Sequence, residues 1–385
     1  IDTAGRLAIA ADAAPSLALY DLDRGSVAQT LTLANPASAV YASPGRRYAL
    51  AFQRPQDVVQ VADGGIWQED HGDHLHDYKR DPKLLASTIE GPQPTHYDDR
   101  GGRASIFMDG RSTVTPAQAA SAVLFTDANL AAGTIAASVN FAVPMHGFAE
   151  PNGDYLVATY RAPEDTGATQ AEIYRRDGAG FTFVQRLAPQ CPGMHGSYTR
   201  GEFTVAGCSD GLLVVRRQGT TFTADRITTP SAVGTIAGHP GSARLVGIGN
   251  AGTPATTRFY DIDPAAGTAA PIEIAGWADG RLRRAHGFDR SGRQLFVLDD
   301  AGTLFVLERT ATGWETRKSI RGAVPVMPLV APFPAFAANQ ARDAVYLTDP
   351  TARQVVVVDT AKLAIDRRLE LDFRPASIAW VGIAR

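Results

Sequence analysis

The stretch 195–207, HGSYTRGEFTVAG, holds a short polar strand, a turn at Gly201 and a second strand, and it recurs along the chain. The best copies are HGFAEPNGDYLVATY from His146, HGFDRSGRQLFVLD from His286, HYDDRGGRASIFMD from His96 and FAANQARDAVYLTD from Phe336. Weaker copies begin near Ala39, Ile236 and Ala376. The eight starts lie 40 to 57 residues apart. A period of 40 to 50 residues with about four strands per unit is typical of a β-propeller.

The two ends of the chain complement each other. The first 34 residues supply the second, third and fourth strands of a unit, and the C-terminal PASIAWVG supplies only a first strand. One blade shared by both ends would close the ring and remove its open edges. We therefore expect an all-β fold: a single propeller domain over residues 1–385, with eight four-stranded blades, or seven if a weak copy is misread.

Composition excludes several partners. The chain of 385 residues is 44% hydrophobic and 20% charged, with a formal net charge of −3. This composition is that of a globular protein, and it gives no basic field for nucleic acid. No apolar run approaches the roughly 18 residues of a membrane helix, so we expect no membrane insertion. The chain begins at Ile1 rather than Met, as a mature chain would after removal of a signal peptide.

The segment 66–78, IWQEDHGDHLHDY, is the most distinctive departure from the repeat. It lies in an insert at about 66–82, between the third and fourth strands of the first unit. Histidine nitrogen with carboxylate oxygen favours zinc over calcium, magnesium or copper(I). The spacing predicts a metal site on a pliant loop, and the alternative is a solvated acidic loop that binds nothing. The candidate ligands are His71, Asp73, His74 and His76.

Histidines also recur at the start of the inner strands. In a propeller these strands line the axial channel, so His96, His146, His195 and His286 are expected at one mouth of it. There they could share a second zinc ion, with Glu150, Asp98 or Asp99 as a further ligand or as acceptor for a ring N–H. The alternative is a set of histidines that only pack against backbone. Strand alternation puts the His-rich loop at the opposite rim.

Two further positions limit the site, because Phe336 and Ile236 occupy equivalent places without a ligand. The channel site therefore cannot be a full ring of histidines. His239 falls out of frame in a turn and is interpreted as a surface residue.

Cys191 and Cys208 are the only cysteines. A hairpin centred near Gly201 would bring them to the same rim, which favours a disulfide and an oxidising compartment. Free thiols, or a thiolate pair sharing zinc with His195, are the alternatives.

The His-x-Asp-His-x-His run, within an eight-bladed propeller, resembles the AztD-type periplasmic zinc metallochaperones. The resemblance implies a protein that stores zinc, holds more than one ion per chain and passes zinc directly to the solute-binding protein of a zinc ABC transporter. It also implies a periplasmic location.

Two other functions compete with this one. One is a metal-dependent, lactonase-like hydrolase, because propellers host such enzymes at the channel mouth. The other is a metal-free protein-interaction propeller. The chain contains no serine-nucleophile motif, dinucleotide fingerprint or cofactor-attachment pattern, and we therefore do not expect an enzyme.

Overall fold

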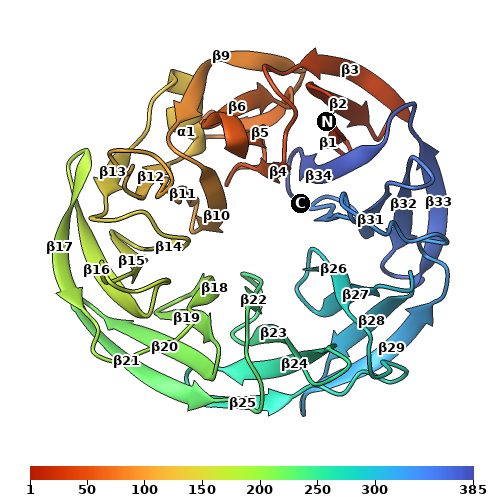
Figure 1. The fold of residues 1–385 in the computed structure, drawn as a ribbon. Coiled ribbons are helices and arrows are strands. Elements are labelled where there is room, and N and C mark those ends of the chain that lie inside the picture. The colour runs from red at the N-terminus through yellow and green to blue at the C-terminus, as the bar shows by residue number, and fades with distance from the viewer.

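The computed structural model describes residues 1–385 and shows eight four-stranded antiparallel sheets arranged around a central channel (Figure 1). The prediction of eight blades is confirmed. We number the blades from the first complete one, so that blade 8 is shared by the two ends of the chain.

The strands of the first four blades alternate direction from the channel outwards. Blade 1 is β4 (Ala39–Ala42), β5 (Tyr48–Gln53), β6 (Val58–Asp63) and β9 (Lys83–Glu90). Blade 2 is β10 (Pro94–Arg100), β11 (Arg103–Met108), β12 (Ser121–Phe125) and β13 (Ala137–Asn140). Blade 3 is β14 (Ala149–Asn152), β15 (Tyr155–Tyr160), β16 (Gln170–Asp177) and β17 (Gly180–Arg186). Blade 4 is β18 (His195–Arg200), β19 (Phe203–Cys208), β20 (Gly211–Gln218) and β21 (Thr221–Thr228).

The remaining blades follow the same order. Blade 5 is β22 (Thr235–Ala237), β23 (Leu245–Ala251), β24 (Thr256–Asp263) and β25 (Thr268–Pro271). Blade 6 is β26 (Arg283–Phe288), β27 (Gln294–Asp299), β28 (Leu304–Arg309) and β29 (Trp314–Ile320). Blade 7 is β30 (Phe336–Ala338), β31 (Ala344–Asp349), β32 (Gln354–Asp359) and β33 (Ala364–Glu370). Blade 8 is β34 (Pro375–Val381), β1 (Arg6–Ala11), β2 (Ser16–Asp21) and β3 (Ser26–Thr32).

Blade 8 closes the ring as predicted. The C-terminal β34 is its inner strand and pairs antiparallel with β1, from Arg6 opposite Val381 to Ala11 opposite Pro375. Neither end of the propeller is therefore left as an unpaired sheet edge. Besides the strands there is one short 3-10 helix, η1 (Arg54–Gln56), and one α-helix, α1 (Asp127–Ala132). Neither helix has the length and apolar character needed to cross a bilayer.

The core lies between the blades rather than within one central mass. Eight clusters of 9 to 14 buried side chains fill the eight interfaces between neighbouring blades. The reason is the period-2 geometry of strands, which turns alternate side chains toward the preceding and the following blade. Middle strands such as VVQVAD and QVVVVD are nearly continuously apolar because both of their faces are covered.

The direction of the inner strands defines two channel mouths. We call the mouth where they begin the start mouth, and the mouth where they end the end mouth. The insert of blade 1 follows β6, whose last residue, Asp63, pairs with Tyr48 at the start of β5. This places the insert at the end-mouth rim. In place of the expected pliant loop, the insert is an antiparallel hairpin of β7 (Ile66–Asp70) and β8 (Leu75–Lys79).

The disulfide between Cys191 and Cys208 is present, with Cα atoms 5.1 Å apart. Both cysteines are fully buried in the core between blades 3 and 4. We expect replacement of both by alanine to lower the free energy of unfolding by about 3 kcal/mol, because the loop of 17 residues is no longer closed in the unfolded chain. Denaturant titration measures this, and reduced wild-type protein should match the variant. An unchanged unfolding midpoint would refute the assignment of a stabilising role.

Candidate metal centre

Three of the four inner-strand histidines meet at the start mouth. His96 lies on β10, His195 begins β18, and His146 lies three residues before β14. The Nε2 atom of His146 is 3.2 Å from that of His96 and 2.9 Å from that of His195. One ring nitrogen from each of the three lies within 4.8 Å of the others. We call this set the histidine triad.

Neighbouring acceptors orient two of the rings. The Nδ1 atom of His195 is 2.7 Å from the Gly234 carbonyl oxygen, which can only accept, so this nitrogen carries the proton. The Nδ1 atom of His146 is 2.9 Å from the Oδ2 atom of Asp109, and a carboxylate there likewise favours the proton on Nδ1. In their neutral forms both rings therefore aim an Nε2 lone pair at the same point. Two lone pairs 2.9 Å apart repel unless a cation lies between them.

The spacing suits zinc. Tetrahedral zinc with nitrogen at about 2.0–2.1 Å places neighbouring ligand atoms about 3.3–3.4 Å apart. The contacts of His146 with the other two rings are within about half an ångström of that value. Three protein ligands leave a fourth position open, which is the arrangement of zinc sites that exchange a ligand.

The surroundings of His96 lower the pKa of its ring. Burial, and then the charges that His146 and His195 would carry, together lower the pKa of His96 to about 4. The ring is therefore neutral at physiological pH and keeps the lone pair that a metal requires.

Asp109 is a residue beside the triad that sequence analysis missed. It follows β11, where the second strand of blade 2 returns to the start mouth beside the inner-strand histidines. Its Oδ2 atom also accepts from Arg54 at 3.0 Å, while its Oδ1 atom is buried without a partner. The sequence pattern that could have revealed it is an aspartate directly after the second strand of a blade, close to the histidine at the start of the first strand of that blade.

The carboxylates suggested as further ligands lie deeper in the channel wall and have other partners. The Glu150 Oε1 atom accepts from Arg100 at 3.1 Å and from Ser197 at 3.0 Å. Burial, and then the charge of Glu150, raise the pKa of Asp98 well above its usual range. Asp99 faces blade 1 and pairs with Arg46. None of the three contacts a ring of the triad.

His286 does not join the triad. His96 and His195 pair with residues one position before the end of the second strand, whereas His286 pairs with Val297, two positions before the end of β27. Phe288, on the same face of β26, packs in the core between blades 5 and 6. His286 therefore faces back toward blade 5, and its Nδ1 atom lies 3.2 Å from the Nη1 atom of Arg283.

This environment gives a pH prediction. Burial, and then the charge of Arg283, lower the pKa of His286 to about 3, against about 6.5 in an unfolded chain. As pH falls from 6.5 toward 3 the unfolded state binds this proton first, so stability should fall over that window and be unaffected above it. In metal-free protein, His286→Gln should reduce the pH dependence of unfolding by about one proton. An identical pH profile in the variant would contradict this.

The β7–β8 hairpin carries the second group of histidines at its tip. Its stem is held by Trp67 stacked on Tyr78, with ring centroids 5.0 Å apart. At the tip the Nε2 atoms of His74 and His76 are 2.6 Å apart, and the Nδ1 atom of His74 is 2.6 Å from Asp73. The ring of His71 lies 4.8 Å from that of His76, centroid to centroid. The side chain of His74 is 53% exposed and that of Asp73 82%, so this group is open to a partner.

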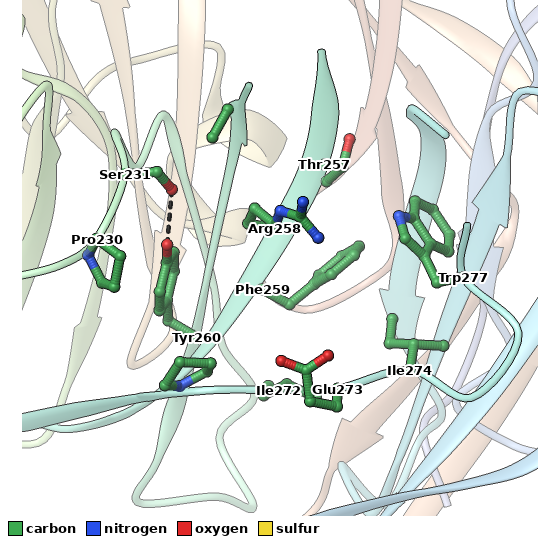
Figure 2. Close-up of a pocket in the computed structure, with 12 residues that line it drawn as sticks. Pro230, Ser231, Thr257, Arg258, Phe259, Tyr260, Ile272, Glu273, Ile274 and Trp277 are labelled. Carbon is green, nitrogen blue, oxygen red and sulfur yellow. Dashed lines mark hydrogen bonds between the residues drawn. The ribbon is translucent and has the colours of Figure 1, made fainter. Parts of the chain in front are cut away.

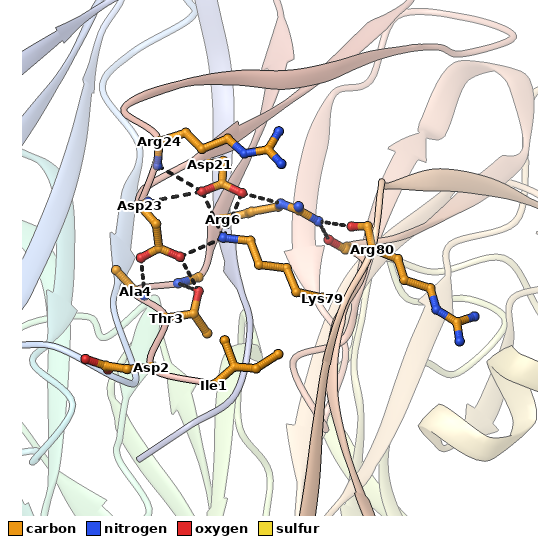
Figure 3. A network of polar contacts seen from close by, with 12 residues as sticks. Ile1, Asp2, Thr3, Ala4, Arg6, Asp21, Asp23, Arg24, Lys79 and Arg80 are labelled. Carbon is orange, nitrogen blue, oxygen red and sulfur yellow. Dashed lines mark hydrogen bonds and ion pairs between the residues drawn. The ribbon is translucent and has the colours of Figure 1, made fainter.

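The base of the hairpin is tied to blade 8 by a buried network (Figure 3). The Nη1 atom of Arg6 donates to the Gly64 and Arg80 carbonyl oxygens at the two ends of the hairpin, at 2.6 and 2.7 Å. Its Nε atom donates to Asp21, which also accepts from Lys79. Arg6, on strand β1 of blade 8, therefore fixes where the hairpin begins and ends.

Two cavities lie away from both histidine groups. One of about 880 Å³ forms the end mouth and is lined by Arg46, Arg100, Tyr97 and Tyr198 among others. The other, of about 360 Å³, lies on the outer strands of blade 5 between Tyr260 and Trp277 (Figure 2). The second contains no cluster of metal ligands.

The fold and the site together define a class: eight-bladed propellers with a histidine cluster in the channel mouth. No protein-family model matches the chain. The chain is a homologue of the zinc chaperone AztD of Citrobacter koseri, to which it is 26% identical over 99% of its own length and 87% of the relative.

Solved structures agree with the fold. A crystal structure of Citrobacter koseri AztD matches with a TM-score of 0.80 and 24% identity, covering 98% of this chain and 97% of that one. The structure of its apo form matches with a TM-score of 0.79, 23% identity and the same coverage. The dihydro-heme d1 dehydrogenase NirN shares only the fold, with a TM-score of 0.61 and 12% identity over 99% of this chain and 76% of that one.

Proposed function

We propose that this protein is a zinc metallochaperone that holds zinc at the histidine triad and at the hairpin tip, and passes it to a zinc-binding acceptor protein. The observation that carries the proposal is the pair of Nε2 lone pairs on His146 and His195, which converge at 2.9 Å. Homology to a zinc chaperone supports zinc as the cargo.

The two sites suit different tasks. The triad is set in the channel mouth, with two rings oriented by Asp109 and Gly234, which favours firm retention. The hairpin tip has exposed ligands, and each imidazole can be replaced in turn by a ligand of the acceptor, so the ion is never released to water. His71, Asp73, His74 and His76 are the ligands proposed there. More than one zinc ion per chain follows from this division.

The proposed acceptor is the solute-binding protein of a zinc ABC transporter, and the proposed location is the periplasm. The disulfide supports an oxidising compartment. This role requires no bond-making chemistry by the protein, and the name of the relative is that of a chaperone, not of an enzyme.

The hairpin variant tests transfer. We expect His71→Ala, His74→Ala and His76→Ala together to remove one zinc equivalent and to slow transfer to an apo solute-binding protein by about 10-fold or more, since all the imidazoles of that site are lost. Elemental analysis of untagged protein gives the stoichiometry, and transfer is followed in the presence of a competing chelator.

The matched control is Leu75→Ala, which removes an exposed side chain from the same hairpin without removing a ligand. Zinc content and transfer rate equal to wild type in the triple variant would exclude the hairpin from the pathway. Untagged protein that remains metal-free under zinc supply would reject the whole proposal, and would leave the metal-free interaction propeller as the better hypothesis.

A further inference from the structure

Blade 6 places an uncompensated positive charge at the start mouth. Arg283 is the first residue of β26 and Arg284 follows it, and neither guanidinium forms an ion pair with any carboxylate. The Nε atom of Arg283 is buried without a hydrogen-bond partner. The contact of its Nη1 atom with the Nδ1 atom of His286, at 3.2 Å, is to a neutral acceptor.

Such an arrangement is costly in a bare protein. A partly buried guanidinium without a counterion loses hydration that its surroundings do not fully replace. Most other arginines near the channel do have a partner: Arg46 pairs with Asp99, Arg100 with Glu150 and Arg281 with Asp299. Arg283 and Arg284 have no such partner, and an anionic ligand would supply one.

Local geometry leaves both guanidinium groups available. The strand has a bulge between Arg283 and Ala285, and a bulge re-aims the side chains beside it. The Cζ atom of Arg284 lies 4.3 Å from the ring centroid of Phe333, and the guanidinium has no hydrogen-bond partner.

His286 completes the chemistry. Because its Nδ1 atom accepts from Arg283, its remaining proton is on Nε2, and the ring presents a donor rather than a lone pair. A metal cation would also be repelled by the adjacent guanidinium. Histidine supplies lone pairs in the triad, whereas here His286 and the two arginines present only hydrogen-bond donors.

We propose that Arg283, Arg284 and His286 form a binding site for a small oxyanion, a carboxylate or a phosphate, at the start mouth of the channel. A planar guanidinium fork matches two oxygens of either anion. The site is distinct from the zinc sites and does not depend on the proposed zinc function.

The experiment uses metal-free full-length protein, freed of chelator by dialysis, at constant ionic strength. Inorganic phosphate and citrate are titrated separately by calorimetry, and thermal unfolding is followed in parallel. We expect saturable binding of at least one of them, with a rise in the unfolding temperature, and affinity reduced about 10- to 100-fold in Arg283→Gln through loss of a charge-assisted pair.

Arg293→Gln is the matched control, since Arg293 lies in the same blade but is exposed and paired with Glu308. It should bind as wild type does. Preference for phosphate or for citrate identifies which anion the site takes. Arg283→Met tests the site without relying on affinity: without an anion it should be at least as stable as wild type, and neither anion should stabilise it.

Absence of saturable binding of both anions up to about 50 mM, or equal binding by wild type and Arg283→Gln, would overturn the proposal. Zinc stoichiometry is measured on the same variants. If wild-type protein does not bind zinc, that result counts against the proposed function alone, because the anion titrations are made without metal.

Discussion

Replacement of His146 by alanine should lower zinc affinity at the triad by at least about 100-fold. His146 is the central member of the triad, since its Nε2 atom lies within hydrogen-bond distance of a ring nitrogen of both other histidines, and the nitrogens of His96 and His195 do not lie that close to each other. Without it, His96 and His195 remain as two ligands with no third. Even loss of an outer partner of a metal-bound histidine commonly costs 10- to 100-fold in affinity, and loss of the ligand itself should cost more.

The measurement is competition with a chelator of known affinity, together with elemental analysis after dialysis. One zinc equivalent should be lost while the hairpin equivalent is kept. His239→Ala is the matched control: the structure places His239 not at an open surface, as the sequence suggested, but in the lining of the end-mouth cavity, away from the triad, where its Nδ1 atom accepts from the Gly241 amide. Unchanged affinity in His146→Ala would remove the triad from any role in zinc binding.

Asp109→Asn separates ligand loss from ring orientation. The change keeps the shape of the side chain but removes the charge that holds the proton on Nδ1 of His146. We expect zinc affinity to fall by about 10- to 100-fold with stoichiometry unchanged at saturating zinc. A fall in stoichiometry without a change in affinity would instead indicate local misfolding.

Replacement of Arg6 by methionine should lower the free energy of unfolding by about 3–5 kcal/mol. Arg6 is 1% exposed, and its partner Asp21 is fully buried, so breaking the pair leaves a buried carboxylate with less compensation. Two carbonyl groups at the base of the hairpin also lose their donor. Burial by itself raises the pKa of Asp21, but hydrogen bonds and the charges of Lys79 and Arg6 lower it overall.

Denaturant titration gives the stability change, and limited proteolysis reports on the hairpin, whose two ends should be cut faster in the variant. Lys79→Met is the control: Lys79 also pairs with Asp21, but it does not hold the Gly64 and Arg80 carbonyl groups, so a smaller loss of stability than in Arg6→Met and no faster cutting at the hairpin ends are expected. Equal stabilities of Arg6→Met and wild type would show that the network in Figure 3 does not hold the hairpin.

The fold was readable from the sequence because its information is local. Each unit repeats a short inner strand, a turn and a middle strand, and the alternation or continuity of apolar residues in each strand follows from which faces are covered. The shared blade follows from counting strands at the two ends. The disulfide follows from the hairpin around Gly201, because the two cysteines flank a pairing that involves neighbouring strands only.

The hairpin marks the limit of that local information. Gly72 and the polar residues around it suggest a pliant loop, but Trp67 on β7 and Tyr78 on β8 stack across the two strands and make a regular stem. Their pairing depends on the position of the turn, and the turn depends on hydrogen bonds at the tip, including that of the Gly72 amide to Asp70. The histidine-rich segment was recognised from its composition, whereas the regular stem that carries it was not predicted.

The sequence by itself indicated eight blades with seven as the alternative, the shared closing blade, a favoured cysteine pair and the list of histidines that could bind a metal. Only the tertiary structure decided which of those histidines meet. Side chains alternate along a strand, so a difference of one residue in register turns His286 to the other face of its blade, beside an arginine, while His96 and His195 converge on His146. Likewise only the packing of blade 2 against blade 3 brings Asp109 to the Nδ1 atom of His146, and so fixes where the lone pairs point.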